Sequence, residues 1–430
     1  MAINNRFPPD SWLGPETQIF YRLQFLKQKG WETSVITLSE KNLKKTVFRG
    51  ILVNYIGRFE NRYAKRNQNF ITMLRWAEKD IFDPLVFLKT LKILIKEKPN
   101  LVWVRCLDQV SLAPLLAARL LRFPTVITPA DFWWLCHISD PLTTCLGLDG
   151  RSCASCIYKE EWVSTKSNRK MQVTFLNEIL HILHRIKEKV FVSAFNLIIF
   201  PSEFLKCQYV REMKKIPKNV LIYNPGIIEV TPELSEDIRV KLNLKNERII
   251  LYVGTLRFPK AVDLLVLAFD EIKKEIPDAK LIIVGDGPEK NNLLSLAKKS
   301  EFRNDIIFTG NISDRKELSG YYKISDVFVA PSRYYYPPSY SAVVLEALAH
   351  GKPVVVTENG DGSVLKNGVN GYKVSFLLKD LANGVIKVLQ DNKTNFSENN
   401  KSLYKKLFSY DAVFNKYFEV FCSVAENKQK

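Results

Sequence analysis

Ile249-Ile250-Leu251-Tyr252-Val253-Gly254-Thr255-Leu256-Arg257-Phe258-Pro259-Lys260 is the stretch that decides the fold of the second half of the chain. Its first five residues form a short apolar run that a glycine ends, which predicts a buried strand of a parallel sheet. A helical apolar pattern follows at residues 262–274. A strand that passes through a loop into a helix is the repeating unit of doubly wound α/β sheets.

The same alternation continues in both directions along the chain. Further strands are predicted at 280–284, 306–309, 327–330 and 353–357 in the second half, and at 33–37, 101–104, 125–128 and 197–200 in the first. Helices are predicted at 16–29, 85–96, 112–121, 175–190 and 342–349. A connector at 219–232 contains Pro225-Gly226 and marks the expected domain boundary. The sequence therefore predicts two doubly wound domains.

Composition limits the class of protein. The 430 residues carry a formal net charge of +18, and no apolar run approaches the roughly 18–20 residues that span a bilayer. These features predict a soluble, cytoplasmic protein whose basic excess favours an anionic partner. No recognised nucleic-acid module accompanies the charge, so nucleic acid is not the expected partner.

One basic segment mixes cations with aromatic residues. It consists of Arg58, Phe59, Arg62, Tyr63, Lys65 and Arg66. Such a segment can grip a lipid phosphate or an anionic membrane surface, which would place the protein at the inner face of the membrane. A plain basic surface loop is the alternative.

The predicted helix at 175–190 has an apolar stripe and a polar side. The stripe comprises Phe175, Leu176, Ile179, Ile182, Leu183 and Ile186 and is expected to face the core. Glu178, His181 and His184 lie on the other side. Their spacing resembles a metal site, but a solvated face explains it better.

Four of the seven cysteines crowd into one stretch. They are Cys136, Cys145, Cys153 and Cys156. Only the last pair has the two-residue spacing typical of zinc ligands, so a structural zinc site and a set of thiols that staple a loop both remain open.

Charged residues of the second half follow strands at the edge where ligands bind in such sheets. Gly254, Arg257 and Lys260 occupy the first loop, where a close backbone and two cations suit a diphosphate. Glu346 stands on an otherwise apolar helix, and burying a carboxylate there is costly unless it holds a partner. Vicinal ribose hydroxyls suit it, and an ordinary salt bridge is the alternative.

Taken together, these motifs resemble the retaining glycosyltransferases of family 4, the group 1 glycosyltransferases, which have the GT-B fold. The resemblance covers residues 249–375 and adds further motifs in the family's order: Gly285-Asp286-Gly287-Pro288, Phe308-Thr309-Gly310, Pro331-Ser332, Glu346-Ala347-Leu348-Ala349 and Asn367 to Gly371. The first half is similar to the family's acceptor domain around Gly14 and around Asp131.

The resemblance implies a fold of two Rossmann-like domains that face each other across a cleft. An acceptor domain would span 1–225, a donor domain 226–400, and a closing segment at 401–430 would return a helix to the first domain. The implied activity is transfer of a hexose from a nucleoside diphosphate sugar, with retention, to a glycan or lipid-linked acceptor. No cofactor would be required for catalysis.

The resemblance also implies roles for individual residues. Arg257 and Lys260 would hold the donor diphosphate and stabilise its charge, and Glu346 would bind the ribose. Donor binding would further involve Gly254, Gly285, Gly287 and the backbone around Ser341, Ala342 and Val343. Gly14 and Asp131 would lie on the acceptor side.

Three residues depart from the family pattern. Pro338 replaces its first glutamate, Ala130 its histidine before the aspartate, and Ala261 its glycine after the lysine. These departures keep open a catalytically impaired donor-binding protein or a partner subunit. A GT-B phosphorylase or epimerase is a further alternative.

Overall fold

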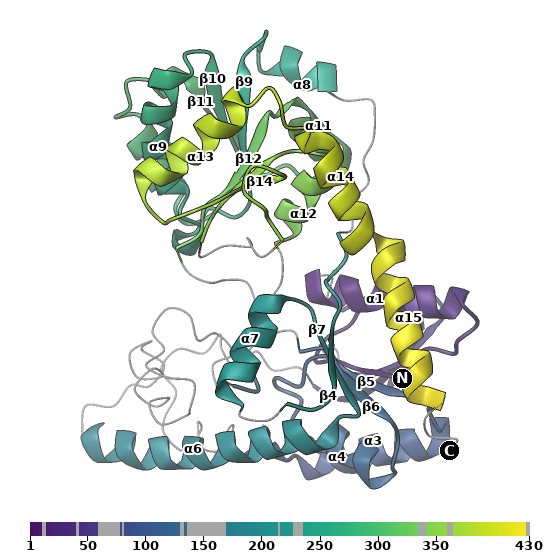
Figure 1. Cartoon of the computed structure of the whole chain (residues 1–430). Helices are drawn as coiled ribbons and strands as arrows, with labels where there is room; N and C mark the ends of the chain where they lie inside the picture. The colour runs from purple at the N-terminus through teal and green to yellow at the C-terminus, as the bar shows by residue number, and fades with distance from the viewer. Residues whose placement is uncertain are drawn as a thin grey trace. The chain divides into compact units, whose positions relative to one another are not determined.

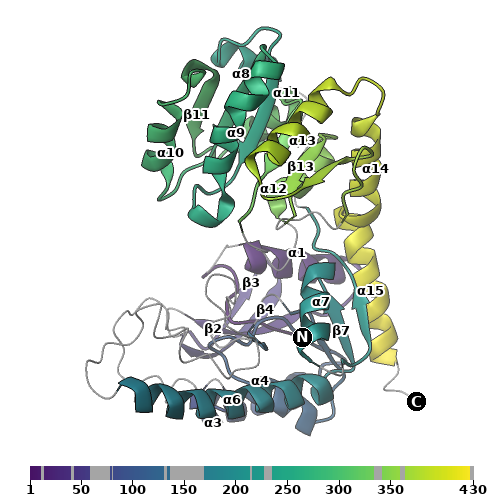
Figure 2. The ribbon, with the colours of Figure 1, turned by 60° about the vertical axis from the view of Figure 1, so that its left-hand side comes forward.

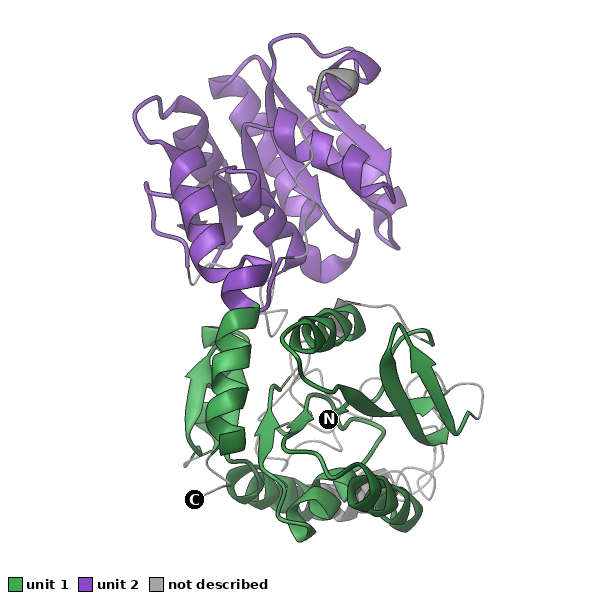
Figure 3. Ribbon diagram, turned by 90° about the vertical axis from the view of Figure 1, so that its right-hand side faces the viewer, with its two compact units in different colours: residues 1–222, 414–430 green, residues 223–413 purple. Residues whose placement is uncertain are grey.

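The computed structural model describes residues 1–10, 14–39, 43–58, 78–79, 81–129, 133–135, 169–213, 216–226, 235–333, 341–358 and 364–426. The chain divides into two compact units, shown in Figure 3. Unit 1 comprises Met1–Ile222 and Phe414–Lys430, and unit 2 comprises Tyr223–Val413. The domain boundaries predicted from the sequence, at 225 and 400, stay predictions.

Unit 1 is an α/β unit built on one sheet with the order β3-β4-β2-β1-β5-β6-β7-β8 (Figure 1). Its described elements are β1 (Ala2–Ile3), α1 (Gly14–Gln28), β2 (Ser34–Ser39), β3 (Lys45–Phe48), β4 (Ile51–Arg58), α3 (Pro84–Glu97), β5 (Val102–Val104), α4 (Ala113–Leu120), β6 (Thr125–Ile127), α6 (Arg169–Ala194), β7 (Leu197–Phe200), α7 (Glu203–Glu212), β8 (Asn219–Leu221) and most of α15 (Tyr410–Glu426). All its pairings are parallel except β3 with β4. The β3–β4 hairpin was not predicted from the sequence.

Helices α3, α4 and α6 cover one face of this sheet, and they lie together in the views of Figures 1 and 2. Each of these helices connects two parallel strands, and all three connections run in the same direction across the sheet. Because such crossovers are right-handed, the three helices lie on the same face. Their inward side chains share one core with the strands, including Val86, Leu94, Leu115 and Phe191. Helix α15 packs instead against α1, with Phe414 against Phe25.

The burial of α6 corrects the sequence prediction. Ile182 and Ile186, assigned to an inward stripe, are exposed, whereas His184 and Lys187 are buried. Lys187 donates a hydrogen bond to the Trp133 carbonyl at 3.2 Å and lies over that indole ring. The sequence pattern was misleading because long polar side chains can be buried when a carbonyl and an aromatic face receive the charged end.

Unit 2 has a second parallel sheet, with the order β11-β10-β9-β12-β13-β14. Its described elements are α8 (Ser235–Lys241), β9 (Arg248–Val253), η2 (Phe258–Lys260), α9 (Val262–Glu275), β10 (Ala279–Val284), α10 (Lys290–Ala297), η3 (Arg303–Asp305), β11 (Ile306–Gly310), α11 (Arg315–Ile324), β12 (Val327–Ala330), α12 (Ala342–Ala349), β13 (Val354–Thr357), β14 (Gly371–Val374), α13 (Leu378–Gln390) and α14 (Phe396–Leu407). One core lies under α9 and α13, and another under α8, α11 and α12.

The strand order of unit 2 reverses between β9 and β12. Ligands of doubly wound sheets bind beyond the carboxyl ends of the strands at such a point. The loops that follow β9 and β12 therefore flank the place where a ligand is expected, and both carry basic residues. The motif predicted to bind phosphate stands in the first of them.

Candidate donor site in unit 2

The loops after β9, β10 and β11 are joined by backbone hydrogen bonds. Gly254 N–H donates to the Val284 carbonyl at 3.0 Å, and Gly285 N–H donates to the Gly310 carbonyl at 2.8 Å. A Cβ atom on Gly285 would lie 1.9 Å from the Gly254 oxygen, and one on Gly287 would lie 2.4 Å from the Leu256 oxygen. Close packing between loops therefore requires both glycines. Their predicted contact with a donor stays a prediction.

Arg257 precedes the short helix η2, and Lys260 is the last residue of that helix. Arg257 is exposed and has an extended backbone, and Lys260 is partly exposed. Ala261 ends η2 with φ +51° and ψ +36°, in the left-handed region. The chain thus keeps the backbone conformation for which glycine is best suited, although alanine occupies the position.

Arg333, two residues beyond Pro331, holds η2 in place. Its backbone N–H donates to the Pro259 carbonyl at 3.0 Å, and its Nη1 donates to the Phe258 carbonyl at 2.7 Å. The guanidinium also pairs with both carboxylate oxygens of Asp263 and lies 4.2 Å from the centre of the Phe258 ring. A bidentate pair of this kind fixes orientation as well as distance. The loop after β12 thereby positions the loop that carries Arg257 and Lys260.

Helix α12 begins at the same edge of the sheet. Ser341 is its N-cap and makes no side-chain capping hydrogen bond. Ala342 and Val343 stand in its first turn, where backbone N–H groups have no acceptor within the helix. The helix dipole adds a partial positive charge at this end. The predicted phosphate contact of these amides fits the geometry and stays a prediction.

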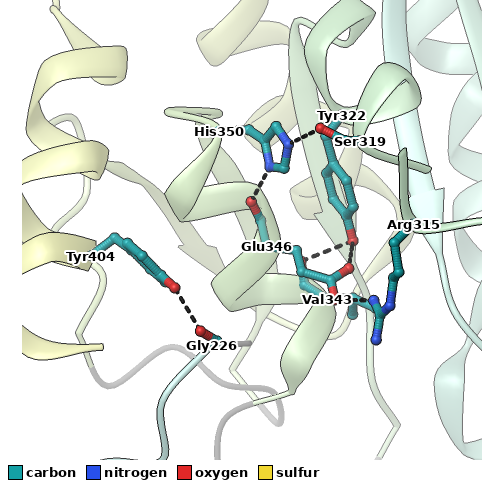
Figure 4. A network of polar contacts seen from close by, with 8 residues as sticks. All are labelled: Gly226, Arg315, Ser319, Tyr322, Val343, Glu346, His350 and Tyr404. Carbon is teal, nitrogen blue, oxygen red and sulfur yellow. Dashed lines mark hydrogen bonds and ion pairs between the residues drawn. The ribbon is translucent and has the colours of Figure 1, made fainter. Parts of the chain in front are cut away.

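Glu346 is a buried charged residue at this edge, with 4% of its surface exposed. Tyr322 Oη donates to Glu346 Oε2 at 2.9 Å, and Arg315 Nη1 donates to Oε1 at 2.7 Å. Figure 4 shows both side chains converging on the carboxylate from α11. Each carboxylate oxygen can accept further hydrogen bonds, so the group is oriented but not saturated.

Burial and charge act on Glu346 in opposite directions. Loss of water raises the pKa of its carboxyl group, and this effect exceeds the lowering caused by Arg315 and Tyr322. Burial also raises the pKa of Tyr322 well above its usual value, which keeps the phenol a donor. Burial, together with the charge of the same carboxylate, raises the pKa of Tyr404 to about 12.

His350 lies one helical turn beyond Glu346 and supports it. Its Nδ1 lies 2.7 Å from the Glu346 carbonyl, its Nε2 lies 2.8 Å from Ser319 Oγ, and its ring stacks on Tyr322. Burial lowers the pKa of the imidazole. Sequence analysis missed this network. The signal was present, because Arg315, Ser319 and Tyr322 recur at i, i+4 and i+7 on one face of α11.

Unit 1 has a polar region at the corresponding edge of its own sheet. Asn4 follows β1, Arg105 follows β5, and both are buried together with Glu16 and Asp108. Burial raises the pKa of Glu16, and the charges of Arg6 and Arg105 oppose this effect. Gly14 begins α1 at this region. Asp131 lies outside the described residues, as do Ala130 and Pro338.

Two predicted features also fall outside what the structure describes. Cys136, Cys145, Cys153 and Cys156 are among the undescribed residues, and so are Arg62, Lys65 and Arg66. The described residues contain no group of three or more His, Cys, Asp or Glu side chains placed to hold a metal. The zinc hypothesis therefore stays a prediction. None of the described helices has the length and apolar character to cross a membrane.

Comparison with known proteins identifies the family of this domain. The sequence profile of "Glycosyl transferases group 1" matches residues 235–403, which include the η2 loop, Glu346 and its partners. These residues form a group 1 glycosyltransferase domain. A likeness to solved glycosyltransferase structures extends over nearly the whole chain, and the described architecture is the GT-B fold with a C-terminal helix.

Two relatives and one solved structure illustrate the similarity. An uncharacterised glycosyltransferase of Methanocaldococcus jannaschii is 26% identical over 262 residues, which is 59% of this chain and 64% of that protein. Alpha-monoglucosyldiacylglycerol synthase of Streptococcus pneumoniae is 30% identical over 168 residues, 38% of this chain and 37% of the synthase. HepE of Anabaena, solved in complex with UDP, has a TM-score of 0.67 at 17% identity, covering 98% of this chain and 100% of HepE. The matched stretches thus span less than two thirds of both curated relatives, and the structural likeness concerns the fold.

Proposed function

We propose that this protein transfers a hexose from a nucleoside diphosphate sugar to an acceptor hydroxyl, with retention of the anomeric configuration. The observation that carries the proposal is the buried carboxylate of Glu346, held between Tyr322 and Arg315 at the carboxyl edge of the unit 2 sheet. A buried, oriented acceptor of hydrogen bonds suits the two vicinal hydroxyls of a ribose. HepE, which has the same fold, was solved with UDP.

The chemistry follows from the two cations of the η2 loop. The bond between the anomeric carbon and the diphosphate oxygen breaks, and negative charge builds on the leaving diphosphate. Arg257 and Lys260 would stabilise that charge, and the N-terminus of α12 would add its dipole. The acceptor oxygen bonds to the same face of the carbon, and its proton passes to the departing phosphate oxygen. This route needs neither a cofactor nor a dedicated side-chain base.

The proposed acceptor is a glycan or a lipid-linked glycan, as in polysaccharide assembly. Gly14 and the polar residues after β1 and β5 would lie on the acceptor side, with Asp131. The similarity to a synthase named for a glucosyldiacylglycerol supports a lipid-linked acceptor. We also propose a cytoplasmic location, with peripheral attachment at the inner face of the membrane.

Calorimetry with UDP and a panel of nucleotide sugars tests the donor. The expected result is binding by the parent and a loss of most affinity in Lys260→Ala. Lys274→Ala is the matched control, because Lys274 is an exposed lysine of the same unit that pairs with Glu271. Equal affinity of Lys260→Ala and the parent would refute the diphosphate role.

Slow hydrolysis of UDP-glucose tests the stereochemistry. Early proton NMR spectra should show α-glucose before mutarotation, because retention preserves the donor's α configuration. β-Glucose as the first product would contradict retention. Donor binding without turnover, when acceptors are also supplied, would favour the impaired donor-binding protein.

A further inference from the structure

The outer face of α3 in unit 1 has an unusual composition for a surface helix. Leu85, Leu88 and Ile95 are 69%, 52% and 53% exposed, whereas Val86 and Leu94 face the core. The helix itself is well defined. Asp83 caps its start by accepting from two backbone N–H groups, and Lys98 ends it in the left-handed conformation. The exposed aliphatic side chains are therefore held outward by a stable element.

Lysines share this face with the aliphatic residues. Lys89, Lys92 and Lys96 are exposed at helical positions between and beside them. Lys89 Nζ also donates to the Ile56 carbonyl at 3.0 Å, which leaves Lys92 and Lys96 as the outermost cations of the three. The one acidic residue of α3, Glu97, is only partly exposed and pairs with Lys45. The outward charge of α3 is thus positive.

Neighbouring helices extend the same composition. Leu120 at the end of α4 is 64% exposed beside Arg119 and Arg122, and α4 packs against both α3 and α6. On α6, Ile182 and Ile186 are exposed along with Arg185 and Lys189, and Glu178 is exposed one turn before Ile182. We call the exposed set Leu85, Leu88, Lys92, Ile95 and Lys96, with Leu120 and Ile182, the aliphatic–basic face.

We propose that the aliphatic–basic face docks on an anionic lipid bilayer. Charge complementarity favours this occupant, since lysines on an outward helical face attract anionic headgroups while the aliphatic side chains enter the boundary of the acyl region. Lysine stems can lie along apolar surface with their ammonium groups in the headgroup layer. The inference deepens the proposed function and rests on it for its purpose, because attachment would bring the enzyme to a lipid-linked acceptor.

This assignment differs from the one that the sequence suggested. Sequence analysis placed membrane contact on the segment containing Arg58, Arg62, Lys65 and Arg66. The structure describes only Arg58 of these four, as the exposed last residue of β4. The aliphatic–basic face is built entirely from described residues.

Co-sedimentation with vesicles tests the proposal. The probes are vesicles of phosphatidylcholine mixed equally with phosphatidylglycerol, and vesicles of phosphatidylcholine alone. The parent should bind the anionic vesicles at low salt and ignore the neutral ones. Binding should weaken as salt rises, because the Debye length falls from about 10 Å at 0.1 M to about 3 Å at 1 M.

Two variants separate the two parts of the face. Lys92→Gln with Lys96→Gln should weaken binding roughly 25-fold, since each basic residue near the surface contributes about fivefold. Leu85→Ser with Leu88→Ser and Ile95→Ser should weaken it by at least about tenfold. The matched controls lie in unit 2. They are Lys298→Gln with Lys299→Gln, and Val240→Ser with Leu267→Ser, all at exposed positions.

Several outcomes would overturn the proposal. These are a parent that does not sediment, equal binding to neutral vesicles, or variants that bind like the parent. A parent that is a dimer and becomes monomeric in the serine variant would assign the face to a second copy of the chain. Melting temperature and donor affinity should equal those of the parent in every variant. Vesicle binding that persists in a parent without donor affinity would refute the proposed function and leave this inference standing.

Discussion

The outer faces of α3 in unit 1 and α9 in unit 2 can be compared directly, because both helices have 14 residues and cover a parallel sheet. The exposed face of α9 carries Leu267, Glu271, Lys274 and Glu275, with an ion pair between Glu271 and Lys274. The exposed face of α3 carries lysines and aliphatic residues without an exposed acid. Folding requires only the inward stripe, so the outward composition of α3 calls for another explanation.

The charged residues at the strand ends distinguish unit 2. Unit 2 concentrates Arg257, Lys260, Arg315, Arg333 and Glu346 where its strands end, and the group 1 profile covers this region. We propose that unit 2 recognises the donor at its strand ends, and that unit 1 adds a broad surface on its helices to the acceptor side at its own strand ends. Changes at the unit 2 strand ends should therefore alter donor affinity and leave vesicle binding unchanged.

The largest effect is expected from Glu346→Gln. A neutral amide keeps the size of the side chain but removes the charge, and hydrogen bonds to charged groups contribute about 1.5–3 kcal/mol. Affinity for UDP-glucose should fall roughly 100-fold by calorimetry, while sedimentation with anionic vesicles stays the same. Glu275→Gln, at an exposed position of the same unit, should match the parent. Affinity within about twofold of the parent would remove Glu346 from the donor site.

Arg333→Ala should have the next largest effect, because it releases the η2 loop. The Phe258 carbonyl and Asp263 would both lose their partner, and a displaced Lys260 would bind a diphosphate less well. A fall of about tenfold in donor affinity is expected, comparable to one charge-assisted hydrogen bond. Arg333→Lys should restore only part of it, since lysine lacks the bidentate fork.

Asp263→Asn distinguishes positioning from direct contact. It breaks the same ion pair from the other side and places no change on Arg333 itself. If Arg333 acts by holding the loop, Asp263→Asn should also lower donor affinity. Unchanged or higher affinity would mean that Arg333 contacts the diphosphate directly.

Five of the six strands of the unit 2 sheet were predicted from the sequence because each is a short apolar run, whereas β14 was not predicted. The strand predicted at 249–253 corresponds to β9, and the helix predicted at 342–349 matches α12. The partners of Glu346 were not predicted, since Arg315 and Tyr322 reach it only when α11 packs against α12. Arg333 and Asp263 are 70 residues apart, and no sequence spacing relates them.

The feature hardest to predict from the sequence was which helical side chains of unit 1 are exposed and which are buried. The pattern at Ile182 and Ile186 indicates an amphipathic helix but does not reveal which face the sheet covers. Lys187 is buried because the Trp133 carbonyl and ring receive its ammonium group, and Trp133 is distant in sequence. The hairpin of β3 and β4 was also missed. β3 is a four-residue edge strand without buried residues, which leaves little pattern, whereas β4 is apolar and largely buried and could have been recognised.

Arg315→Gln should produce a smaller effect that depends on pH. The pKa of Glu346 is already raised by burial, so its carboxylate ionises at a higher pH than an ordinary glutamate. Donor affinity should therefore fall as pH drops through this raised pKa, because the protonated acid accepts hydrogen bonds less well. Removing the Arg315 cation raises the pKa further and moves the loss of affinity to higher pH.

Calorimetry with UDP-glucose over a pH series measures this shift, since its doubly esterified diphosphate stays ionised throughout. Well above both pKa values the variant should differ from the parent by only a few-fold. Lys316→Gln is the control, because Lys316 is exposed beside Arg315 on the same turn. Identical pH profiles of Arg315→Gln and the parent would show that Arg315 does not act on the carboxylate.

The smallest effect is expected at Ala261, where the chain departs from the glycine of its family. The left-handed conformation of Ala261 costs about 1–2 kcal/mol relative to an ordinary one. Glycine would remove that strain, but it would lose about 0.8 kcal/mol of buried methyl contact and about 0.5–1 kcal/mol of backbone entropy. These terms nearly cancel, so Ala261→Gly should change the free energy of unfolding by less than about 1 kcal/mol. Donor affinity should also stay the same, because the backbone of η2 does not move.

Ala261→Val sharpens the test, since a β-branched residue is strongly disfavoured at positive φ and this position is fully buried. Denaturant titration should place the valine variant well below the other two. A large gain in donor affinity with glycine would instead mean that alanine distorts the diphosphate loop.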